Sequence, residues 1–572
     1  MPADKDLQIQ LLQQMLEQQQ KYIESLEARN IEQEATIADL RSAIEELRSL
    51  KANLEETIAE FRRKFFGTGS EKTSSGTEPS SDRQNTQSDD DKVNVNGYTR
   101  PRKNKSKRND MYPDIPVRDV ICKVPEKDRY CPYCNAPMAP IANTFIREEL
   151  RIIPARVERV RYLQETLICP ECRKDGDGTI IKADAPASLM KHSPLSPSIG
   201  AFVIFHKIFM NTPYYRQETA AFQYGIKLPR ETMANWLIYC GQEYFLPIFE
   251  KMHSLLLNRD IIHADETTCQ VLREENKTAE STSYMWIYAS GSDGLPKIIL
   301  YDYQPGRAGA YPREFLAGFS GLLQCDGYQG YNAVEDVILV CCMAHCRRKF
   351  FEAVPAARRK KMKLLDINSE ETIPDQDIPA ESKWPDMIPA EIGLIHCNKL
   401  FHIEQGLKAL EPEERSRKRR ELETPVWDSF WKWLATVDPL GGSKLAKAVT
   451  YANNHKDTLV NYMLDGRCEI SNNRAERCAK SYAIGRKNSL FHTSVDGAQA
   501  SAIMYSIVET AKANGLNVLQ YLYMVLLYMP DYKNEPAGIE QLLPWSEFMK
   551  EYCTGLADFE TITPENHAPL PL

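Results

Sequence analysis

From residue 259 onward, apolar segments of strand length run directly into carboxylates. In RDIIHADETTCQVL (259–272), the pair Ile261-Ile262 is followed by Asp265 and Glu266. GLLQCDGYQGYNAV (321–334) reaches Asp326 in the same way. A buried carboxylate costs several kcal/mol unless it is paired or bound to a metal, so these acids need partners. Because neighbouring residues of a strand point to opposite faces, Asp265 and Glu266 are not expected to serve the same site.

The order of the elements around these acids predicts the fold class. We expect five strands, at 259–272, 283–290, 296–304 and 321–334 and at the start of VILVCCMAHCRRKFFEAV (337–354), with a helical stretch at 308–319. An RNase H-like sheet has this order: three antiparallel strands, followed by further strands and helices. In such a sheet, carboxylates near the first and fourth strands lie side by side. The chain is therefore expected to be multidomain α+β, with an RNase H-like α/β domain at 257–514 and a helical insertion at about 352–465.

Two carboxylates do not complete a two-metal site, and EISNNRAERCAKSYAIGRKNSLF (469–491) supplies a third, Glu476. Asn472-Asn473 can cap the helix that carries it. Arg486 and Lys487 follow on the same segment. An acid amid cations suits a site that handles phosphate, since the acid holds Mg²⁺ or Mn²⁺ and the bases hold a nucleic-acid backbone. Taken alone, Glu476 would be read as one partner of a surface salt bridge.

Two C-x2-C knuckles predict a structural zinc site. Their cysteines are Cys131, Cys134, Cys169 and Cys172. Four thiolates form a closed tetrahedral site, which folds a module but leaves no open position for catalysis. The span between the knuckles alternates apolar residues as a small β ribbon would. Unrelated cytosolic thiols, or a redox role for one knuckle, are the alternatives, and we assign 111–190 to the zinc-binding module.

A helical hairpin is expected in YRQETAAFQYGIKLPRETMANWL (215–237), with a turn at Gly225 and a second helix opened by Pro229. This is the outline of a helix-turn-helix. The second helix would present Arg230 and Asn235 near its N-terminus, where major-groove contacts are made. A helical hairpin that only builds a core is the alternative for this helical domain, which we place at 191–256.

The N-terminal part repeats with a period of seven. Ile and Leu recur at positions a and d over residues 9–65, a pattern that favours a parallel two-stranded coiled coil, with Asn30 at an a position fixing the register. A long amphipathic helix packed on its own chain is the alternative. We therefore assign a coiled coil to 1–66 and expect the chain to dimerise through it. We assign a disordered linker with the basic tail RPRKNKSKR to 67–110 and a C-terminal element to 515–572.

The composition and charge of the chain limit where the protein can be located and what it can bind. The net charge of −8 argues mildly against a protein coated in nucleic acid, but local basic clusters remain. No apolar run of about 18 residues is present, which predicts no transmembrane helix. The first residues, MPADKDLQIQLLQQ, are too polar for a secretory signal, so we expect a cytoplasmic protein.

The motifs HADET, CDGYQGYN, AHCRRKFFEA and NNRAER…IGRKNSLF together resemble the IS66-family transposases of bacterial insertion sequences. The resemblance extends to FRRKFFGTGSEK (61–72), the paired knuckles, YRQE and LLPW (542–545). It implies a DDE transposase that binds the element's terminal inverted repeats, cleaves there and transfers strands to target DNA. It places the acids at Asp265, Asp326 and Glu476, with two Mg²⁺ or Mn²⁺ per site, and implies a nucleoid-associated protein that acts with small accessory proteins of the same element.

Other residues are expected to hold DNA near these metals. They are His345, Arg347, Arg348, Lys349, Arg486 and Lys487. His263 either shares the site of Asp265 or packs in the core. Two other functions remain open from the residues: a non-catalytic zinc-containing DNA-binding regulator, and an RNase H-like nuclease that cleaves without joining.

Overall fold

The computed structural model describes residues 186–359 and 386–571, together with Gln20 and the short segments 92–95, 98–101, 157–163, 166–168 and 180–182. The expected coiled coil, apart from Gln20, and the four knuckle cysteines lie outside the described residues. The chain divides into two units, Met1–Pro113 and Asp114–Leu572.

Two short β ribbons precede the main body of the fold. Within the first unit, in the segment that we expect to be a linker, β1 (Lys92–Val95) pairs antiparallel with β2 (Tyr98–Pro101). In the second unit, β3 (Thr166–Ile168) pairs antiparallel with β4 (Ile180–Lys182). These two strands stand on either side of the second knuckle in the sequence.

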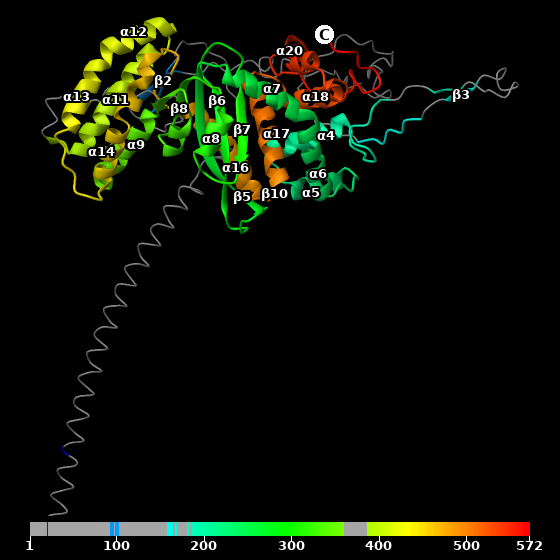
Figure 1. The fold of residues 1–572 in the computed structure, drawn as a ribbon, viewed down its shortest axis with the longest axis horizontal. Helices are drawn as coiled ribbons and strands as arrows, with labels where there is room; N and C mark the ends of the chain where they lie inside the picture. The colour runs from blue at the N-terminus through cyan, green and yellow to red at the C-terminus, as the bar shows by residue number, and fades with distance from the viewer. Residues whose placement is uncertain are drawn as a thin grey trace, which may run out of the picture. The chain divides into compact units, whose positions relative to one another are not determined.

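A mixed sheet forms the centre of the second unit (Figure 1). Its strands lie in the order β7-β6-β5-β8-β9, where β5, β6 and β7 are antiparallel and β8 and β9 run parallel to β5. Their bounds are β5 (Ile261–Arg273), β6 (Thr282–Ser290), β7 (Ile299–Gln304), β8 (Gly321–Cys325) and β9 (Val337–Cys341). A short β10 (His492–Ser494) pairs in parallel with the far end of β5.

The fourth strand is shorter than the sequence predicted. It ends at Cys325, and the chain then turns at Gly327, whose φ of +89° is rarely adopted by other residues. A 3₁₀-helix, η3 (Gln329–Ala333), takes up most of the remaining expected strand. Asp326 therefore stands at the first position beyond β8.

The two faces of the sheet are covered by different elements. On one face, Tyr288 of β6 stacks on Phe315 of α8 (Ala310–Phe315), with ring centroids 4.1 Å apart. On the other, Tyr301 of β7 donates a hydrogen bond from its hydroxyl to the carbonyl of Cys478 in α16 (Asn473–Ser489). Because Glu266 is paired with Trp286 and Asp265 with Ile287, the alternation of β5 sends Glu266 toward α8 and η3 and Asp265 toward α16.

One group of helices packs beside β7 (Figure 1). It comprises α4 (Pro197–Ile208), α5 (Tyr214–Gln223), α6 (Arg230–Cys240), the π-helix η2 (Gly241–Phe245), α7 (Leu246–Leu257), α17 (Val495–Ala513), α18 (Val518–Tyr532), α19 (Pro536–Gln541) and α20 (Glu547–Cys553). The expected helical hairpin is present as α5 and α6, joined through Gly225 at φ +76°. Helix α6 runs on through η2 into α7, so the second helix is longer than expected.

A second group of helices follows β9 and shares a second hydrophobic core with β5, β8 and β9, in which Phe350, Trp427 and Phe430 are buried. Its elements are α9 (Met343–Ala353), α10 (Ala356–Arg359), α11 (Pro389–Leu407), α12 (Pro412–Leu422), α13 (Thr424–Leu434), α14 (Lys444–Asn454), α15 (Lys456–Val460) and the 3₁₀-helix η6 (Asn461–Leu464). Among the described helices, none combines the length and the hydropathy needed to cross a bilayer.

Candidate active site

Three acids from separate parts of the sequence meet beside the sheet. Asp265 lies on β5, Asp326 follows β8, and Glu476 lies in the first turn of α16. Strands β5 and β8 are parallel neighbours, so their acids lie close together. Burial raises the pKa of Asp265 well above its usual range, and the charges of Glu266, Asp326 and Glu476 raise it further. The three acids therefore repel one another within one site.

The loop after β8 holds Asp326 in place. Oδ1 of Asp326 accepts a hydrogen bond from the backbone N–H of Tyr328 at 2.8 Å, and the backbone carbonyl of Asp326 accepts one from the hydroxyl of Tyr451 at 2.9 Å. A Cβ at Gly327 would lie 3.0 Å from the ring of His455. Both the φ of Gly327 and this close approach require glycine next to the acid.

Glu476 is the least satisfied of the three acids. Its Oε1 is buried and has no hydrogen-bond partner among the described residues. Two basic groups lie close to it: Nδ1 of His345 is 3.6 Å from Oε1, and the guanidinium of Arg348 is 3.9 Å from Oε2. Burial raises the pKa of Glu476, and the charge of Asp326 adds to that rise while Arg348 opposes it. A buried carboxylate oxygen without a donor is unfavourable unless a cation or another donor satisfies it.

Asn472 fixes the start of α16 against β5. It occupies the N-cap position, but its side chain makes no capping hydrogen bond, which corrects the sequence expectation. Its amide nitrogen donates to the carbonyl of Ala264 at 2.7 Å, so its Oδ1 accepts from Nδ1 of His263 at 3.1 Å. His263 is thus a buried residue packed beneath the site, and burial lowers its pKa to about 4, which keeps it neutral at pH 7.

Glu266, the neighbour of Asp265, is fully paired on the other face of β5. Its side chain is 2% exposed. Nε of Arg307 donates to Oε1 at 2.7 Å, and the hydroxyl of Tyr331 donates to Oε2 at 2.7 Å. The guanidinium of Arg307 also lies 4.0 Å from Oδ2 of Asp326 and over the ring of Tyr328. Arg307 therefore links Glu266 to the site. The sequence did not single out this arginine, because it stands alone in a Pro-Gly turn.

The site also contains a thiol and an imidazole that offer metal ligands. Among the described residues, ligand atoms of Cys342, His345 and Glu476 lie within 4.8 Å of one another. Burial lowers the pKa of His345 to about 4, with the charge of Arg348 as the next cause, so its imidazole is neutral at pH 7. Burial raises the pKa of the Cys342 thiol to about 12, which keeps it protonated. Cys342 was not singled out in the sequence, although it stands one helical turn before His345.

The expected DNA-binding cations have different surroundings. Arg348 and Lys349 are half-buried on α9, and the ammonium of Lys349 lies 4.9 Å from the ring centre of Tyr451. Arg347 is buried, and its Nε donates to Oδ1 of Asn398 at 2.8 Å, which gives it a structural position inside the helical group. Arg486 bonds Thr267 and Thr268 of β5.

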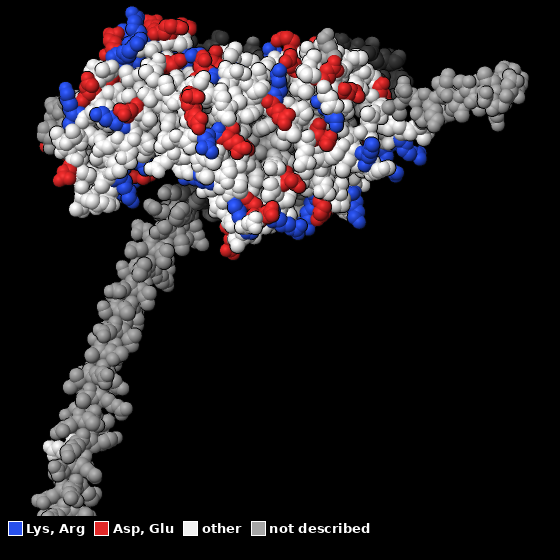
Figure 2. Space-filling model, viewed as in Figure 1, with Lys and Arg blue, Asp and Glu red and all other residues white. Residues whose placement is uncertain are grey.

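The remaining expected DNA-binding residues are exposed. Lys487 lies in the last turn of α16. Arg230 and Asn235 lie on α6, where Arg230 pairs with Glu231 at 3.2 Å. Figure 2 shows Lys and Arg interspersed with Asp and Glu over the visible face, so the cations there do not merge into one large basic surface.

Known proteins match the chain along most of its length. The family model "Transposase IS66 family" matches residues 192–500, the "zinc-finger binding domain of transposase IS66" matches 128–173, and the "IS66 C-terminal element" matches 506–545. The Uncharacterized protein y4hP of Sinorhizobium fredii (strain NBRC 101917 / NGR234) is 26% identical over 76% of this chain and 76% of its own length. The Uncharacterized protein y4jD of the same strain is 27% identical over 76% of this chain and 80% of its own length.

Among solved structures, the Drosophila P element transposase strand transfer complex matches 57% of this chain and 94% of the compared chain, with 11% identity. Its TM-score of 0.33 is too low to support a conclusion.

Proposed function

Because the chain belongs to the IS66 family of transposases, we propose that it binds the terminal inverted repeats of its insertion sequence, cleaves DNA there and joins the ends to target DNA. The family predicted from the sequence motifs is confirmed. The observation that carries the proposed chemistry is the meeting of Asp265, Asp326 and Glu476 beside a sheet whose strand order is that expected of an RNase H-like domain.

The residues of this site fit divalent cations. Three repelling carboxylates, one with a buried oxygen that has no donor in the described part of the chain, provide the oxygen ligands that Mg²⁺ or Mn²⁺ prefers. Bound there, two such ions would supply activation of water or of a freed 3′-hydroxyl and stabilisation of the departing oxygen. No nucleophilic side chain is required, so no covalent link between protein and DNA is expected.

Other side chains would position these acids and the DNA. Arg307 holds Glu266 and approaches Asp326, which fixes the spacing between β5 and the loop after β8. The neutral imidazole of His345 lies beside Glu476 and limits the orientations of that carboxylate. Arg348 and Lys349 are our proposed contacts to the DNA backbone, while the buried Arg347 is assigned to the packing of α9.

We also propose that Cys131, Cys134, Cys169 and Cys172 hold a structural Zn²⁺, since all four lie within the matched zinc-finger domain. Metal analysis of the purified chain should find about one zinc per chain, and Cys131→Ser should lower that content. Zinc-free wild type would refute this part of the proposal. Dimerisation through residues 1–66 and cooperation with accessory proteins complete the proposed assembly.

The decisive experiment incubates the purified chain with Mg²⁺, the accessory proteins and DNA that carries the element's terminal repeats. Wild type should cleave and join, and Asp326→Asn should do neither. Asp302→Asn is the matched control, because Asp302 is also an acid in the sheet whose pKa burial raises, to about 7, but it lies outside the cluster.

Each other result has a distinct meaning. Cleavage without joining would favour the nuclease. Binding without either reaction would favour the non-catalytic regulator. Full activity of Asp326→Asn would refute the assignment of the site.

A further inference from the structure

The turn at the end of α16, formed by Ser489, Leu490 and Phe491 and here called the 489–491 turn, is strained. Leu490 has φ +66° and ψ −57°, and the N–H of Phe491 donates to the carbonyl of Ser489 at 2.9 Å. This is the γ-turn with positive φ, which is rare and unfavourable, and it is a marked outlier for a residue as bulky as leucine. Strain of this kind persists where the surrounding structure imposes it, and it clusters at functional sites.

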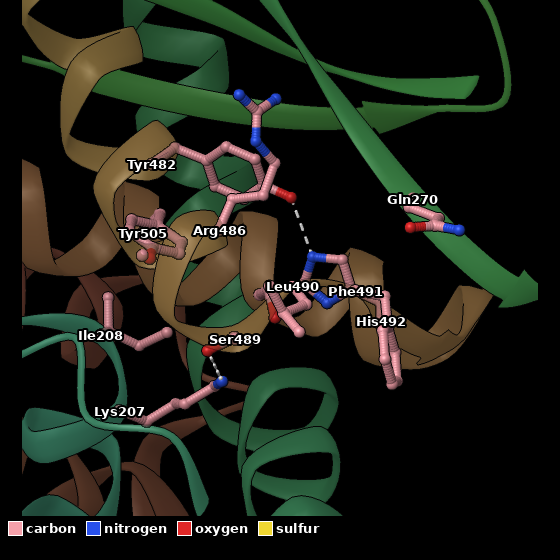
Figure 3. A pocket seen from close by; sticks show the side chains of 12 residues that line it. Lys207, Ile208, Gln270, Tyr482, Arg486, Ser489, Leu490, Phe491, His492 and Tyr505 are labelled. Carbon is pink, nitrogen blue, oxygen red and sulfur yellow. Dashed lines mark hydrogen bonds between the residues drawn. The ribbon is translucent and has the colours of Figure 1, made fainter. Parts of the chain in front are cut away.

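The surroundings of the 489–491 turn do impose it. Nζ of Lys207 in α4 donates to Oγ of Ser489 at 2.6 Å, and the N–H of Leu490 donates to the carbonyl of Arg486 at 2.7 Å (Figure 3). Nδ2 of Asn488 donates to the carbonyl of Asn211 at 3.1 Å. The turn is therefore fixed by α4, by the loop after α4 and by α16 itself.

The strained turn presents apolar side chains to solvent. Leu490 is 64% exposed and Phe491 is 44% exposed. They border a pocket that is also lined by Lys207, Tyr482 and Tyr505 (Figure 3). An exposed leucine in a strained conformation does not stabilise the fold. This indicates that the surface contacts a partner.

The charges beside the turn indicate that this partner is nucleic acid. Arg486 and Lys487 occupy the last turn of α16, directly before the exposed pair. Proteins unstack and bend DNA by combining two features. Cations contact the phosphates, and apolar side chains insert between neighbouring bases. Arg486 also bonds Thr267 and Thr268, which follow Asp265 and Glu266 on β5, so the turn is joined to the acid-bearing strand.

We propose that Leu490, supported by Phe491, is a wedge that inserts between two bases of the DNA end bound at the acid site. This inference rests on the proposed function. Helix α16 carries Glu476 and leads directly into the wedge, and at about 1.5 Å per residue it places Leu490 about 21 Å beyond Glu476. DNA that follows α16 rises about 3.4 Å per nucleotide, so the unstacked step lies about six nucleotides from the cleaved phosphate.

The test uses the full chain and duplexes of the element's terminal repeat, each with one 2-aminopurine placed three to nine nucleotides from the cut. Ca²⁺ replaces Mg²⁺ so that binding is observed without cleavage. Wild type should raise the fluorescence severalfold at one position near the sixth nucleotide. Leu490→Ala should lose most of this rise while DNA affinity changes little. Ile484→Ala is the matched control, because Ile484 is an apolar residue of α16 with 45% exposure and lies outside the turn.

A second variant separates the wedge from a folding defect. Leu490→Gly removes the side chain and relieves the positive φ, so it should melt at a higher temperature than wild type and still lose the fluorescence rise. An unchanged rise in Leu490→Ala would overturn the inference, as would equal losses in Leu490→Ala and Ile484→Ala. A changed association state in sedimentation, with the rise intact, would assign the turn to a protein interface instead.

The proposed function has a separate readout in the same samples. Wild-type cleavage with Mg²⁺ but no fluorescence rise at any position would refute the wedge and leave the transposase proposal standing. Neither binding nor cleavage by wild type would refute the proposed function, and the wedge with it.

Discussion

Two consecutive carboxylates on one strand of this protein have opposite surroundings. Glu266 faces α8 and η3, where Arg307 and Tyr331 bond both of its oxygens. Asp265 faces α16, where its Oδ1 accepts the N–H of Glu266 at 2.9 Å and its other neighbours among the described residues include two further acids. Both side chains have raised pKa values with burial as the first cause, but cationic and hydroxyl donors oppose the rise only at Glu266.

The difference separates a structural acid from a candidate ligand. A buried charge that is paired and hydrogen-bonded can be retained by the fold alone, whereas an unpaired one destabilises it. Repulsion among Asp265, Asp326 and Glu476 therefore reduces stability in a way that cation binding would reverse. Such a loss of stability at one site is expected where function requires it.

The largest expected effect comes from Asp265→Asn. It should reduce DNA cleavage on the order of 10³-fold, because a metal ligand contributes several kcal/mol to stabilisation of the transition state. The same change should raise the melting temperature without added divalent cation at pH 7, since it removes one repelling charge. Cleavage assays and thermal melts on the same samples measure both.

The pH dependence of this gain in stability provides a control. Because the folded-state pKa of Asp265 is raised above its unfolded value, ionisation of Asp265 destabilises the fold above the unfolded pKa. The advantage of Asp265→Asn should thus be largest at neutral pH and shrink toward pH ~3, below the unfolded pKa, where the wild-type side chain is mostly protonated in both states. Equal melting temperatures at pH 7 would contradict the repulsion that we infer at this site.

Glu266→Gln should change stability less than Asp265→Asn, because two contributions oppose each other. The raised folded-state pKa of Glu266 favours a neutral side chain, whereas the pair with Arg307 favours the charge that glutamine lacks. Glutamine can still accept from Tyr331, and Arg307 is partly exposed, so the lost pair contributes near the lower end of about 1–3 kcal/mol. Denaturant titration measures the net change. Cleavage should fall less than for Asp265→Asn, because Arg307 also approaches Asp326. If Glu266→Gln abolished cleavage and Asp265→Asn did not, the roles of the two acids would be exchanged.

Local patterns in the sequence were sufficient to predict the elements that carry the acids. Strand periodicity placed β5, β6 and β7 within a few residues, and a polar helix start identified the region of α16. The alternation of β5 also predicted that Asp265 and Glu266 do not serve the same site. These features depend on neighbours in sequence, which is why they could be predicted.

The partners of these residues depend on contacts between distant segments, which no local pattern contains. Arg307 reaches Glu266 across the sheet only because the turn after β7 folds back over it. Asn472 looked like a helix cap, yet its side chain bonds β5 instead. The basic run Arg347-Arg348-Lys349 looked uniform, but the period of a helix turns Arg347 into the core while its neighbours stay half-buried.

The smallest expected effect concerns an exposed acid–base pair, Arg230 and Glu231, which lies on the surface of α6. Exposed pairs contribute little to stability, so Arg230→Gln should leave the melting temperature unchanged, in contrast to Asp265→Asn. If α6 contacts DNA, the loss of one phosphate contact should lower the slope of log affinity against log salt by about 1. Lys418→Gln, which breaks a pair with Glu421 on α12, is the control for loss of one positive charge elsewhere. Equal salt slopes for wild type and Arg230→Gln would exclude Arg230 from the DNA interface and favour the hairpin of α5 and α6 as a purely structural element.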